Sequence, residues 1–519
     1  MDTEEISKGI LNSAVLYAIA GLVIVIISCG DIPSIRSRYR KLPGAPIVGA
    51  KSRFEPAWLT RYRFTLSGWA IVNDGWKNVQ SGVFTVIRPD SNVTVIPRKY
   101  VDELSSIPDH RLAASEPIVN DMMRQYTRSD ILLGGHLGHH AVKNKLSPQL
   151  GNLVGLIEEE LLIAASEEPL DVTTEWSEHK LSHYVSRLMG RVTSRLFLGV
   201  PICRNPTWLQ LQLDLVKAIF ETTVIMRNLP RFTHPVVGAL LPSRKRLLKC
   251  MNGLHCFLIP LIEERRAKEK TQDPSYEKPR DVMEWMMELA NEEESEPSNL
   301  ANRFVYTILG SVQTVVEVIM NCIYELCVRP GYIEPLREEM RLALREDNGW
   351  GKRTASKLIR TDSFIKEISR HYPPSALSFR RITKEAITLS DGLVLPKDTY
   401  ICVATTSPEQ DELGETDQAE FDGYRYYRKR LAQNSPSSRY DYASTDKSHV
   451  SFGHGRYACP GRFAASIEVK LLLAHILLHY DVRLSPRMSC RPQSIKILEF
   501  QFLDPEATVE LRTIISSGH

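Results

Sequence analysis

SFGHGRYACPGRF, residues Ser451–Phe463, is the most informative stretch of this chain. Glycines at positions 453, 455 and 461 allow backbone turns that other residues resist. Directly after the loop, apolar residues predict a strong helix from Arg462 to about His479. Backbone N–H groups and the positive end of this helix can face the sulfur of Cys459 and favour its thiolate form. A lone cysteine is most often a small buried apolar residue, but Phe-Gly-x-Gly before it and Pro-Gly after it favour a functional thiolate here.

The remainder of the chain predicts a mainly α (α+β) body with small sheets. Two β-branched runs, Val83–Ile87 and Val93–Ile96, flank five turn-forming residues and have the signature of a hairpin. Sheet character returns around 387–403, and the very polar segment 263–298 is expected to be a solvated connection. Helical spacing of apolar residues predicts helices over Leu153–Ala165, Lys180–Leu198, Trp208–Arg227 and Arg303–Cys327.

Composition and motif content exclude several classes of protein. The chain has 519 residues, 43% hydrophobic and 24% charged, and can bury a large core without a stabilising metal or disulfide. Its net charge of +3 is too small to indicate a surface that binds nucleic acid. Nine cysteines without CxxC pairs argue against a disulfide scaffold or a zinc finger and favour a reducing compartment. Walker A, GxGxxG, GxSxG and HExxH motifs are absent from the sequence.

The N-terminal region predicts a membrane anchor. Ile10–Cys29 is an uncharged run of about twenty mostly apolar residues, long enough to cross the hydrocarbon core as a helix. Acidic residues precede it and a basic cluster from Arg36 to Lys41 follows it, which places the body of the protein in the cytosol. A cleavable signal peptide is the alternative, but the apolar run is long and its preceding residues are acidic. A stiff Pro-Gly-Ala-Pro connector follows, so we expect an anchor with a basic flank over 1–41 and one catalytic domain over 42–519.

The cysteine loop resembles the cysteine-ligand loop of the cytochrome P450 family, especially that of its fungal members. The resemblance implies the cytochrome P450 fold and haem b (iron protoporphyrin IX), with Cys459 as the axial ligand of the iron and Phe452 beside the haem. A thiolate ligand pushes electron density toward bound oxygen and assists O–O cleavage. The family often has Arg or His two residues before the cysteine, where this chain has Tyr457. The resemblance therefore implies that Tyr457, or the neighbouring Arg456, contacts a haem propionate.

A Glu-x-x-Arg pair upstream of the cysteine is a further family mark. The spacing places both side chains on one helix face, where they can form an ion pair. The pattern occurs four times, and only Glu367/Arg370 lies at the familiar distance before Cys459. Arg425 matches the third member of the family's Glu-Arg-Arg cluster, which implies a structural role for all three residues. For the other pairs, Glu263/Arg266, Glu334/Arg337 and Glu338/Arg341, we expect solvated helix faces.

The predicted helix from Arg303 should pass over the haem. Its sequence Gly310–Val315 aligns with the family's Ala/Gly-Gly-x-acid-Thr-Thr, which implies that Thr314 orders water near bound oxygen. Gln313 replaces the usual acid, and an amide cannot give up a proton at ordinary pH. Proton delivery then runs through Thr314 and water, or the chemistry is less demanding than hydroxylation. The alternative for Thr314 is a core threonine that bonds its own backbone.

Further family positions concern the haem propionates. His139 and Lys143 have the spacing of the family's Trp-x-x-x-Arg on an early helix, and Arg381 fits a position that often carries a propionate-binding arginine. An ordinary surface charge is the alternative for each. His136, His139 and His140 have metal-ligand spacing in part, but no acidic partner or signature accompanies them, so we do not predict a metal site there.

The resemblance implies an oxidoreductase, a monooxygenase that inserts one oxygen atom from O2 into an apolar small molecule. Family analogy suggests a terpenoid-derived substrate in fungal secondary metabolite biosynthesis. No flavin or nicotinamide domain is visible, so electrons are expected from an NADPH-cytochrome P450 reductase, at the endoplasmic reticulum membrane. Gln313 and Val315 leave open a desaturase, an isomerase or a peroxide-driven enzyme. A non-catalytic haem sensor or electron carrier is the third possibility, which the long helix with Thr314 disfavours.

Overall fold

The computed structural model describes residues 39–52, 54–271, 275–405, 420–432, 438–488 and 490–514. The predicted membrane segment Ile10–Cys29 lies outside the described residues. Near the beginning of the described chain, Tyr39 is buried and packs edge-on against Tyr400, with 5.3 Å between the ring centroids. Leu42 is buried as well, so the connector after the basic cluster packs onto the body.

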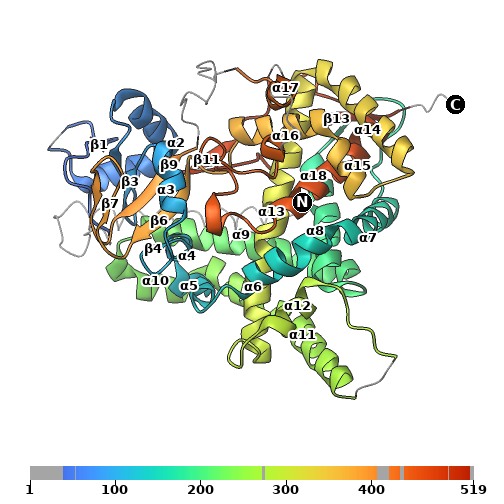
Figure 1. The fold of residues 1–519 in the computed structure, drawn as a ribbon, viewed down its shortest axis with the longest axis horizontal. Helices are drawn as coiled ribbons and strands as arrows, with labels where there is room; N and C mark the ends of the chain where they lie inside the picture. Colours follow the sequence, from blue (N-terminus) through green and yellow to red (C-terminus); the bar gives the residue numbers. More distant parts are fainter. Residues whose placement is uncertain are drawn as a thin grey trace, which may run out of the picture.

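Helices form most of the body, and the predicted mainly α fold with small sheets is confirmed (Figure 1). The longest described helix, α13 (Pro297–Val328), runs through the centre of the body and packs against α8, α11, α16 and α18. Its N-terminus is capped by the side chain of Glu296, which accepts a hydrogen bond from the N–H of Asn299 at 2.7 Å. The other helices are α2 (Ala57–Asn78), α3 (Val101–Ser105), α4 (Ser115–Asp121), α5 (Arg124–Thr127), α6 (Leu137–His140), α7 (Ser147–Glu167), α8 (Leu181–Leu198), α9 (Pro206–Asn228), α10 (His234–Leu240), α11 (Pro242–Lys270), α12 (Val282–Leu289), α14 (Ile333–Asp347), α15 (Lys352–Lys357), α16 (Ile359–His371), α17 (Arg425–Ala432) and α18 (Arg462–His479).

A mixed sheet of six strands, in the order β1-β2-β3-β9-β6-β4, lies to one side of the helices (Figure 1). The predicted hairpin is confirmed: β2 and β3 pair antiparallel with Phe84 opposite Val95, and Arg88 N–H donates to the carbonyl of Ser91 at 2.9 Å. In the smaller sheets, β13 pairs with β10 on one side and β5 on the other, β11 pairs with β12, and β7 pairs with β8. The strands are β1 (Ile47–Val48), β2 (Phe84–Ile87), β3 (Asn92–Val95), β4 (Leu112–Ala113), β5 (Ser177–His179), β6 (Leu377–Thr383), β7 (Ile387–Thr388), β8 (Val394–Leu395), β9 (Tyr400–Ala404), β10 (Tyr480–Arg483), β11 (Ile495–Ile497), β12 (Phe500–Phe502) and β13 (Val509–Thr513).

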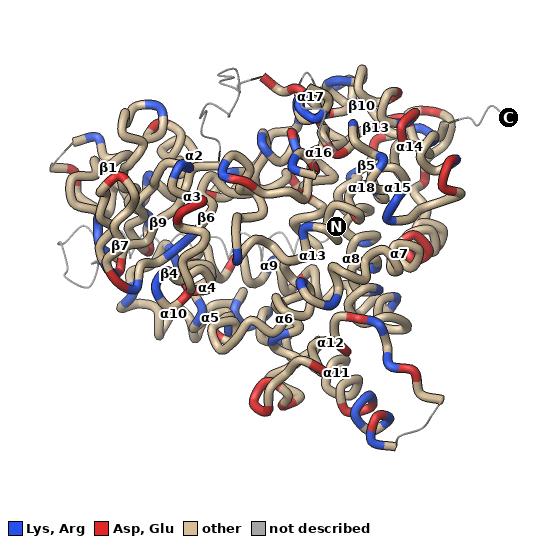
Figure 2. Tube along the Cα trace, in the orientation of Figure 1, with Lys and Arg blue, Asp and Glu red and all other residues tan. Residues whose placement is uncertain are grey.

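The expectation of a solvated connection over 263–298 is wrong in part. This stretch contains the end of α11 and the whole of α12. Arg265 is buried and donates to Asp281 at 2.6 Å, with Glu284 at 3.4 Å, and both acids are buried too. The charged residues therefore include an internal ion cluster that joins α11 to the start of α12. The far end of α11, at the bottom of Figure 2, carries exposed charges of both signs, and further exposed charges follow between α11 and α13.

Candidate active site

The loop around Cys459 is a tight turn made possible by its glycines. Gly453 and Gly455 have φ angles of 68° and 75°, in the left-handed region that favours glycine. A Cβ on Gly455 would lie 2.5 Å from the Cβ of Ser105, so a side chain does not fit there. The Cys459 N–H donates to the carbonyl of Phe452 at 2.7 Å and closes the loop. Cys459 is thereby held directly before helix α18.

The sulfur of Cys459 faces the first N–H groups of α18, as expected from its place before a helix. Burial raises the pKa of the Cys459 thiol, while the backbone N–H groups of Gly461 and Arg462 and the Arg462 charge lower it in part. The net shift is upward, so the free thiol keeps its proton at neutral pH. A coordinating thiol is deprotonated by the metal ion itself, and the same N–H groups then stabilise the thiolate.

Tyr442 connects the cysteine loop to the central helix. Its ring packs 5.0 Å from the ring of Phe452, measured between centroids. Burial raises the pKa of Tyr442, and the nearby thiols of Cys322, on α13, and Cys459 raise it further. Tyr442 thus lies near both Phe452, the predicted cofactor neighbour in the loop, and Cys322 of α13.

The middle of α13 has an open face although the helix runs through the centre of the body (Figure 1). Gly310 and Thr314 are exposed, whereas Val312, Val315 and Val316 are buried. Residues four positions apart share a helix face, so this face borders an opening inside the protein. The Thr314 hydroxyl donates to the carbonyl of Gly310 at 3.1 Å. The backbone bond expected as the alternative is therefore present, and the hydroxyl oxygen can still accept a hydrogen bond.

Sequence reasoning missed Glu317, which follows Thr314 by three positions on the same helix. Burial raises the pKa of the Glu317 carboxyl to about 8, and a hydrogen bond with the side chain of Gln313 lowers it in part. Gln313 itself is half-buried. The sequence did contain a signal: Glu317 is an acidic residue within an otherwise apolar stretch of α13. It lies one helical turn after Gln313, the position where the expected acid is lacking.

Arg381 is buried beside the cysteine loop. Its guanidinium lies 5.7 Å from the ring centroid of Tyr457 and 4.1 Å from that of Phe379. Its Nη1 donates to the carbonyl of Arg380 at 2.8 Å, while its Nη2 has no hydrogen-bond partner among the described residues. Burial lowers the pKa of Arg381 to about 10. The predicted residues Arg381 and Tyr457 are therefore neighbours, with one buried N–H group of the arginine still to be satisfied.

His139 lies near Lys143 and near Arg462, which follows Cys459 in the loop. Burial and, to a lesser extent, the charges of Lys143, His140, His136 and Arg462 together lower the pKa of His139 to about 4. The ring centroids of His136 and Tyr457 are 6.1 Å apart. Positive charge therefore accumulates between the segment with His139 and the cysteine loop.

Arg462 is a further site residue that the sequence analysis treated only as the start of a helix. It acts electrostatically on both Cys459 and His139, and its Nη1 donates to the carbonyl of Cys459 at 2.8 Å. Arg456, the predicted substitute for Tyr457 in the propionate contact, has an exposed side chain. Of the two predicted residues, Tyr457 is the one that the structure places beside Arg381.

The structure brings Glu367, Arg370 and Arg425 together. Glu367 is fully buried and accepts two hydrogen bonds from Arg370, at 2.7 and 2.8 Å. Arg425 Nε donates to the same carboxylate at 3.3 Å, and both arginines also donate to the carbonyl of Glu420. The N–H of Asp422 completes the set at 3.0 Å. This cluster fixes α16 against the segment around Asp422, upstream of the cysteine loop.

The expectation of a solvated face is wrong for Glu334/Arg337. Arg337 is buried and donates to the carbonyls of Leu477 and Tyr480, at 2.6 and 2.9 Å, and to Asp481 at 2.8 Å. These bonds fasten α14 to the end of α18 and the start of β10. The pair has the same spacing as Glu367/Arg370, so the spacing alone does not distinguish the two.

The residues around Cys459 fit a haem. The sulfur is faced by N–H groups and is partly accessible, as an axial ligand of iron must be. The free Nη2 of Arg381 and the positive charge around His139 lie beside the loop, where carboxylates would supply the missing acceptors. Haem carries two propionates that meet this requirement.

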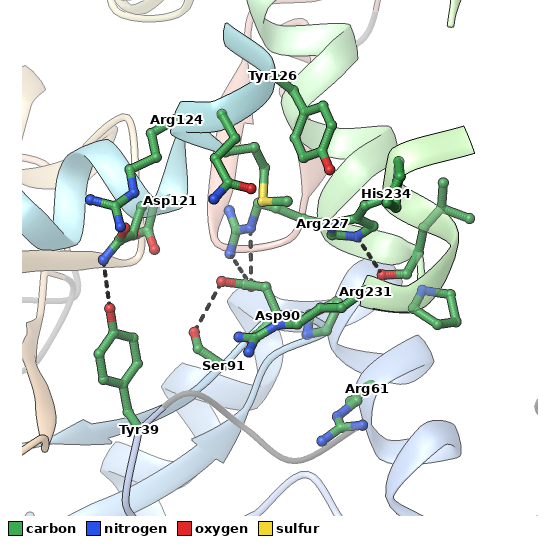
Figure 3. A pocket seen from close by; sticks show the side chains of 17 residues that line it. Tyr39, Arg61, Asp90, Ser91, Asp121, Arg124, Tyr126, Arg227, Arg231 and His234 are labelled. Atoms are coloured by element: carbon green, nitrogen blue, oxygen red, sulfur yellow. Dashed lines mark hydrogen bonds and ion pairs between the residues drawn. The ribbon is translucent and has the colours of Figure 1, made fainter. Parts of the chain in front are cut away.

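A separate polar pocket of about 270 Å³ lies between α2, the β2–β3 turn, α5 and the α9–α10 connection (Figure 3). Figure 3 shows Arg227 pointing toward Asp90, which it contacts at 3.1 Å. Burial raises the pKa of Asp90, but Arg227 and Arg88 lower it more, so that it lies well below its usual range. None of the residues predicted to bind haem lines this pocket. It belongs to an ionic network that supports the sheet.

Comparisons with known proteins agree with this geometry. The family model described as Cytochrome P450 matches residues 146–511. The cytochrome P450 monooxygenase AN1598 of Emericella nidulans is 39% identical over 474 residues, 91% of this chain and 88% of that protein. An ent-kaurene oxidase of Gibberella intermedia is 35% identical over 471 residues, 90% of this chain and 87% of that protein. The solved structure of retinoic acid bound cyanobacterial CYP120A1 has the same fold, with a TM-score of 0.68 at 16% identity over 91% of this chain and 100% of that chain.

A family match over more than half of the chain and relatives similar over nearly all of it identify the protein. Members of this family bind haem through a thiolate, consume O2 and receive electrons from a redox partner. The chain belongs to the cytochrome P450 family and is a monooxygenase, an oxidoreductase.

Proposed function

We propose that Cys459 is the thiolate ligand of haem b, and that the enzyme inserts one oxygen atom from O2 into an apolar, terpenoid-derived small molecule. The observation that carries the proposal is the sulfur of Cys459, which faces the N–H groups of Gly461 and Arg462 at the start of α18. When bound, haem supplies the activation of dioxygen, which amino-acid side chains cannot perform. The protein supplies ligation, proton control and the shape of the substrate site.

Each predicted site residue then has a task. Arg381, with Tyr457 beside it, binds one propionate through its unsatisfied Nη2. His139 and Lys143 contribute to binding the other, and an approaching carboxylate favours the protonated form of His139. Thr314 holds its hydroxyl on the open face of α13, where it orders water. Glu367, Arg370 and Arg425 act structurally by fixing the segment upstream of the cysteine loop.

The terpenoid substrate class is supported by the relatives. The 35% identical protein of Gibberella intermedia is named an ent-kaurene oxidase, and ent-kaurene is a terpenoid hydrocarbon. Relatives at this identity support the class of substrate and leave the compound open.

We further propose that Ile10–Cys29 anchors the protein in the endoplasmic reticulum membrane and that an NADPH-cytochrome P450 reductase donates the electrons. Apolar side chains near the N-terminal end of the described body support a membrane position. Tyr62 and Leu66 of α2 and Val236 and Leu240 of α10 are between 55% and 66% exposed. Exposed apolar side chains of this size favour contact with an apolar surface such as a membrane.

Reconstitution with a reductase tests the proposed reaction. Membranes containing the full chain, the reductase and NADPH are supplied with a panel of terpenoids and isotopically labelled dioxygen. We expect a product that carries one labelled oxygen atom and forms only when reductase and NADPH are present. A product without the label would indicate desaturation or isomerisation, and turnover with peroxide alone would indicate the peroxide-driven alternative; either result contradicts the proposal.

A further inference from the structure

We propose that Glu317 is the proton donor of this monooxygenase, acting with Thr314 in place of the acid that Gln313 has replaced. Inserting one oxygen atom follows RH + O2 + NADPH + H⁺ → ROH + H2O + NADP⁺, so two protons reach the site where water forms. Gln313 cannot release a proton. The inference rests on the monooxygenase activity of the family and adds a residue that carries protons in this chain.

The position of Glu317 on α13 is the first support. Residues 310, 314 and 317 recur at the spacing of one helix face, and the first two are exposed on the inner opening. Side chains three positions apart on a helix are neighbours, with about 5–6 Å between their Cβ atoms. Glu317 is half-buried on this face. Its carboxyl group can therefore reach the Thr314 hydroxyl directly or through one water molecule.

The second support is the nearness of the Gln313 side chain to the Glu317 carboxyl group, whose pKa it lowers in part. Gln313 lies one helical turn before Glu317 and can orient its carboxyl group. The residue that stands in the position of the family's acid would then hold Glu317 in place. The other acid in the second half of α13, Glu325, is occupied elsewhere, because it accepts from Tyr372 and pairs with Arg329. Within this half of the helix, Glu317 is the acid placed next to Thr314.

The protonation state of Glu317 suits this role. Burial raises the pKa of its carboxyl to about 8, so it carries a proton at neutral pH and can both release and regain it near that pH. The groups around it on α13 are Gln313, Thr314 and Asn321, whose Nδ2 donates to the backbone carbonyl of Glu317 at 2.8 Å. Arg491, in the C-terminal segment, donates a hydrogen bond to the side-chain oxygen of Asn321, which lies one helical turn beyond Glu317. In each turnover Glu317 gives its proton toward Thr314 and recovers one from solvent, so its own state does not change overall.

The test compares Glu317→Gln with the double variant Gln313→Glu/Glu317→Gln, which returns the acid to position 313. In the reconstituted enzyme we expect Glu317→Gln to lower product formation by about a hundredfold and to divert NADPH oxidation into hydrogen peroxide. The double variant should recover most of the product formed per NADPH. Glu338→Gln, on the exposed face of α14, is the matched control and should behave like wild type. Unchanged product yield in Glu317→Gln, or a double variant as poor as the single one, would overturn the proposal.

A measurement independent of turnover separates this inference from the choice of substrate. Infrared spectra of the substrate-free haem enzyme should contain the C=O band of a protonated carboxyl that disappears near pH 8 and is missing from Glu317→Gln. Glu317→Asp keeps the acid one methylene shorter and should retain a displaced band and more than a tenth of the product yield. The reduced carbon monoxide spectrum verifies that each variant binds haem. Identical bands in wild type and Glu317→Gln would refute the proposal even if no substrate were found.

Discussion

Arg380 and Arg381 are adjacent in strand β6, yet they belong to two regions with opposite charge balance. Arg380 joins the ionic network beneath the polar pocket, 3.7 Å from Asp121 and 3.6 Å from Glu499. Although burial opposes its charge, Tyr400, Asp121 and Glu499 raise the pKa of Arg380 above its usual value. Arg381 lies beside the cysteine loop, and burial lowers its pKa to about 10.

This difference in charge balance separates buried charges that stabilise the fold from buried charges that bind a ligand. In the network, Arg88 contacts Asp121 at 2.5 Å and Glu499 at 2.8 Å, and Arg227 contacts Glu499 at 3.2 Å, so every guanidinium has carboxylates from the same chain. Single nitrogens of Arg227 and Arg380 also lack a hydrogen-bond partner, but both side chains have carboxylates nearby. Around the loop, Arg381 keeps an unsatisfied Nη2 and pairs with no carboxylate among the described residues. A buried cation without its own partner is unfavourable unless a bound anion completes it. We therefore assign Arg380 to stability and Arg381 to the propionate.

Removing a carboxylate from the network should have the largest effect on stability. Glu499→Gln leaves Arg88, Arg227 and Arg380 short of a shared negative charge in a fully buried site. We expect it to lower the free energy of unfolding by about 3–5 kcal/mol, measured by urea denaturation of the haem-containing protein. Glu506→Gln, in the exposed pair with Lys180, is the control and should cause no measurable change. Equal effects of the two variants would mean that the network does not support the fold.

Arg381 should show the reverse pattern, with a smaller effect. Arg381→Leu removes a cation that has no carboxylate partner among the described residues, so the free energy of unfolding, followed by the same method, should fall by no more than the haem-binding free energy that is lost. Haem binding should weaken by about 1.5–3 kcal/mol, which is a 10- to 150-fold faster transfer of haem to a trapping protein. A variant that unfolds easily but holds haem as tightly as wild type would place Arg381 with Arg380 and end the distinction.

The cysteine loop and the Glu367 cluster were predictable because their signals are local. Glycine spacing, the cysteine before a helix and the Glu-x-x-Arg spacing are all contained in short stretches of sequence. The roles of Arg380 and Arg381 were not separable in this way. Between Ser378 and Arg381 the pairing of β6 with β9 shifts register, and Phe379 adopts a φ of 49°, in the left-handed region. Such an irregularity re-aims the side chains that follow it, and nothing in the sequence announces it.

Buried charge was the other source of error. Arg337 and Arg265 belong to polar stretches that indicate solvent, but tertiary contacts bury them with Asp481 and Asp281. Glu317 was overlooked for a related reason, since its importance depends on the inner opening beside α13 and on its bond to Gln313. Sequence periodicity gives the face of a helix but does not say whether that face meets core, solvent or a cofactor.

The account depends most on the sulfur of Cys459, and the spectrum of the reduced enzyme with carbon monoxide tests it most directly. Wild type and Cys490→Ala, which removes an exposed free cysteine, should both give the absorbance band of a thiolate-ligated haem. Cys459→Ala should lose this band together with oxygen-dependent turnover. A purified Cys459→Ala protein that kept its haem band and full turnover would contradict the account.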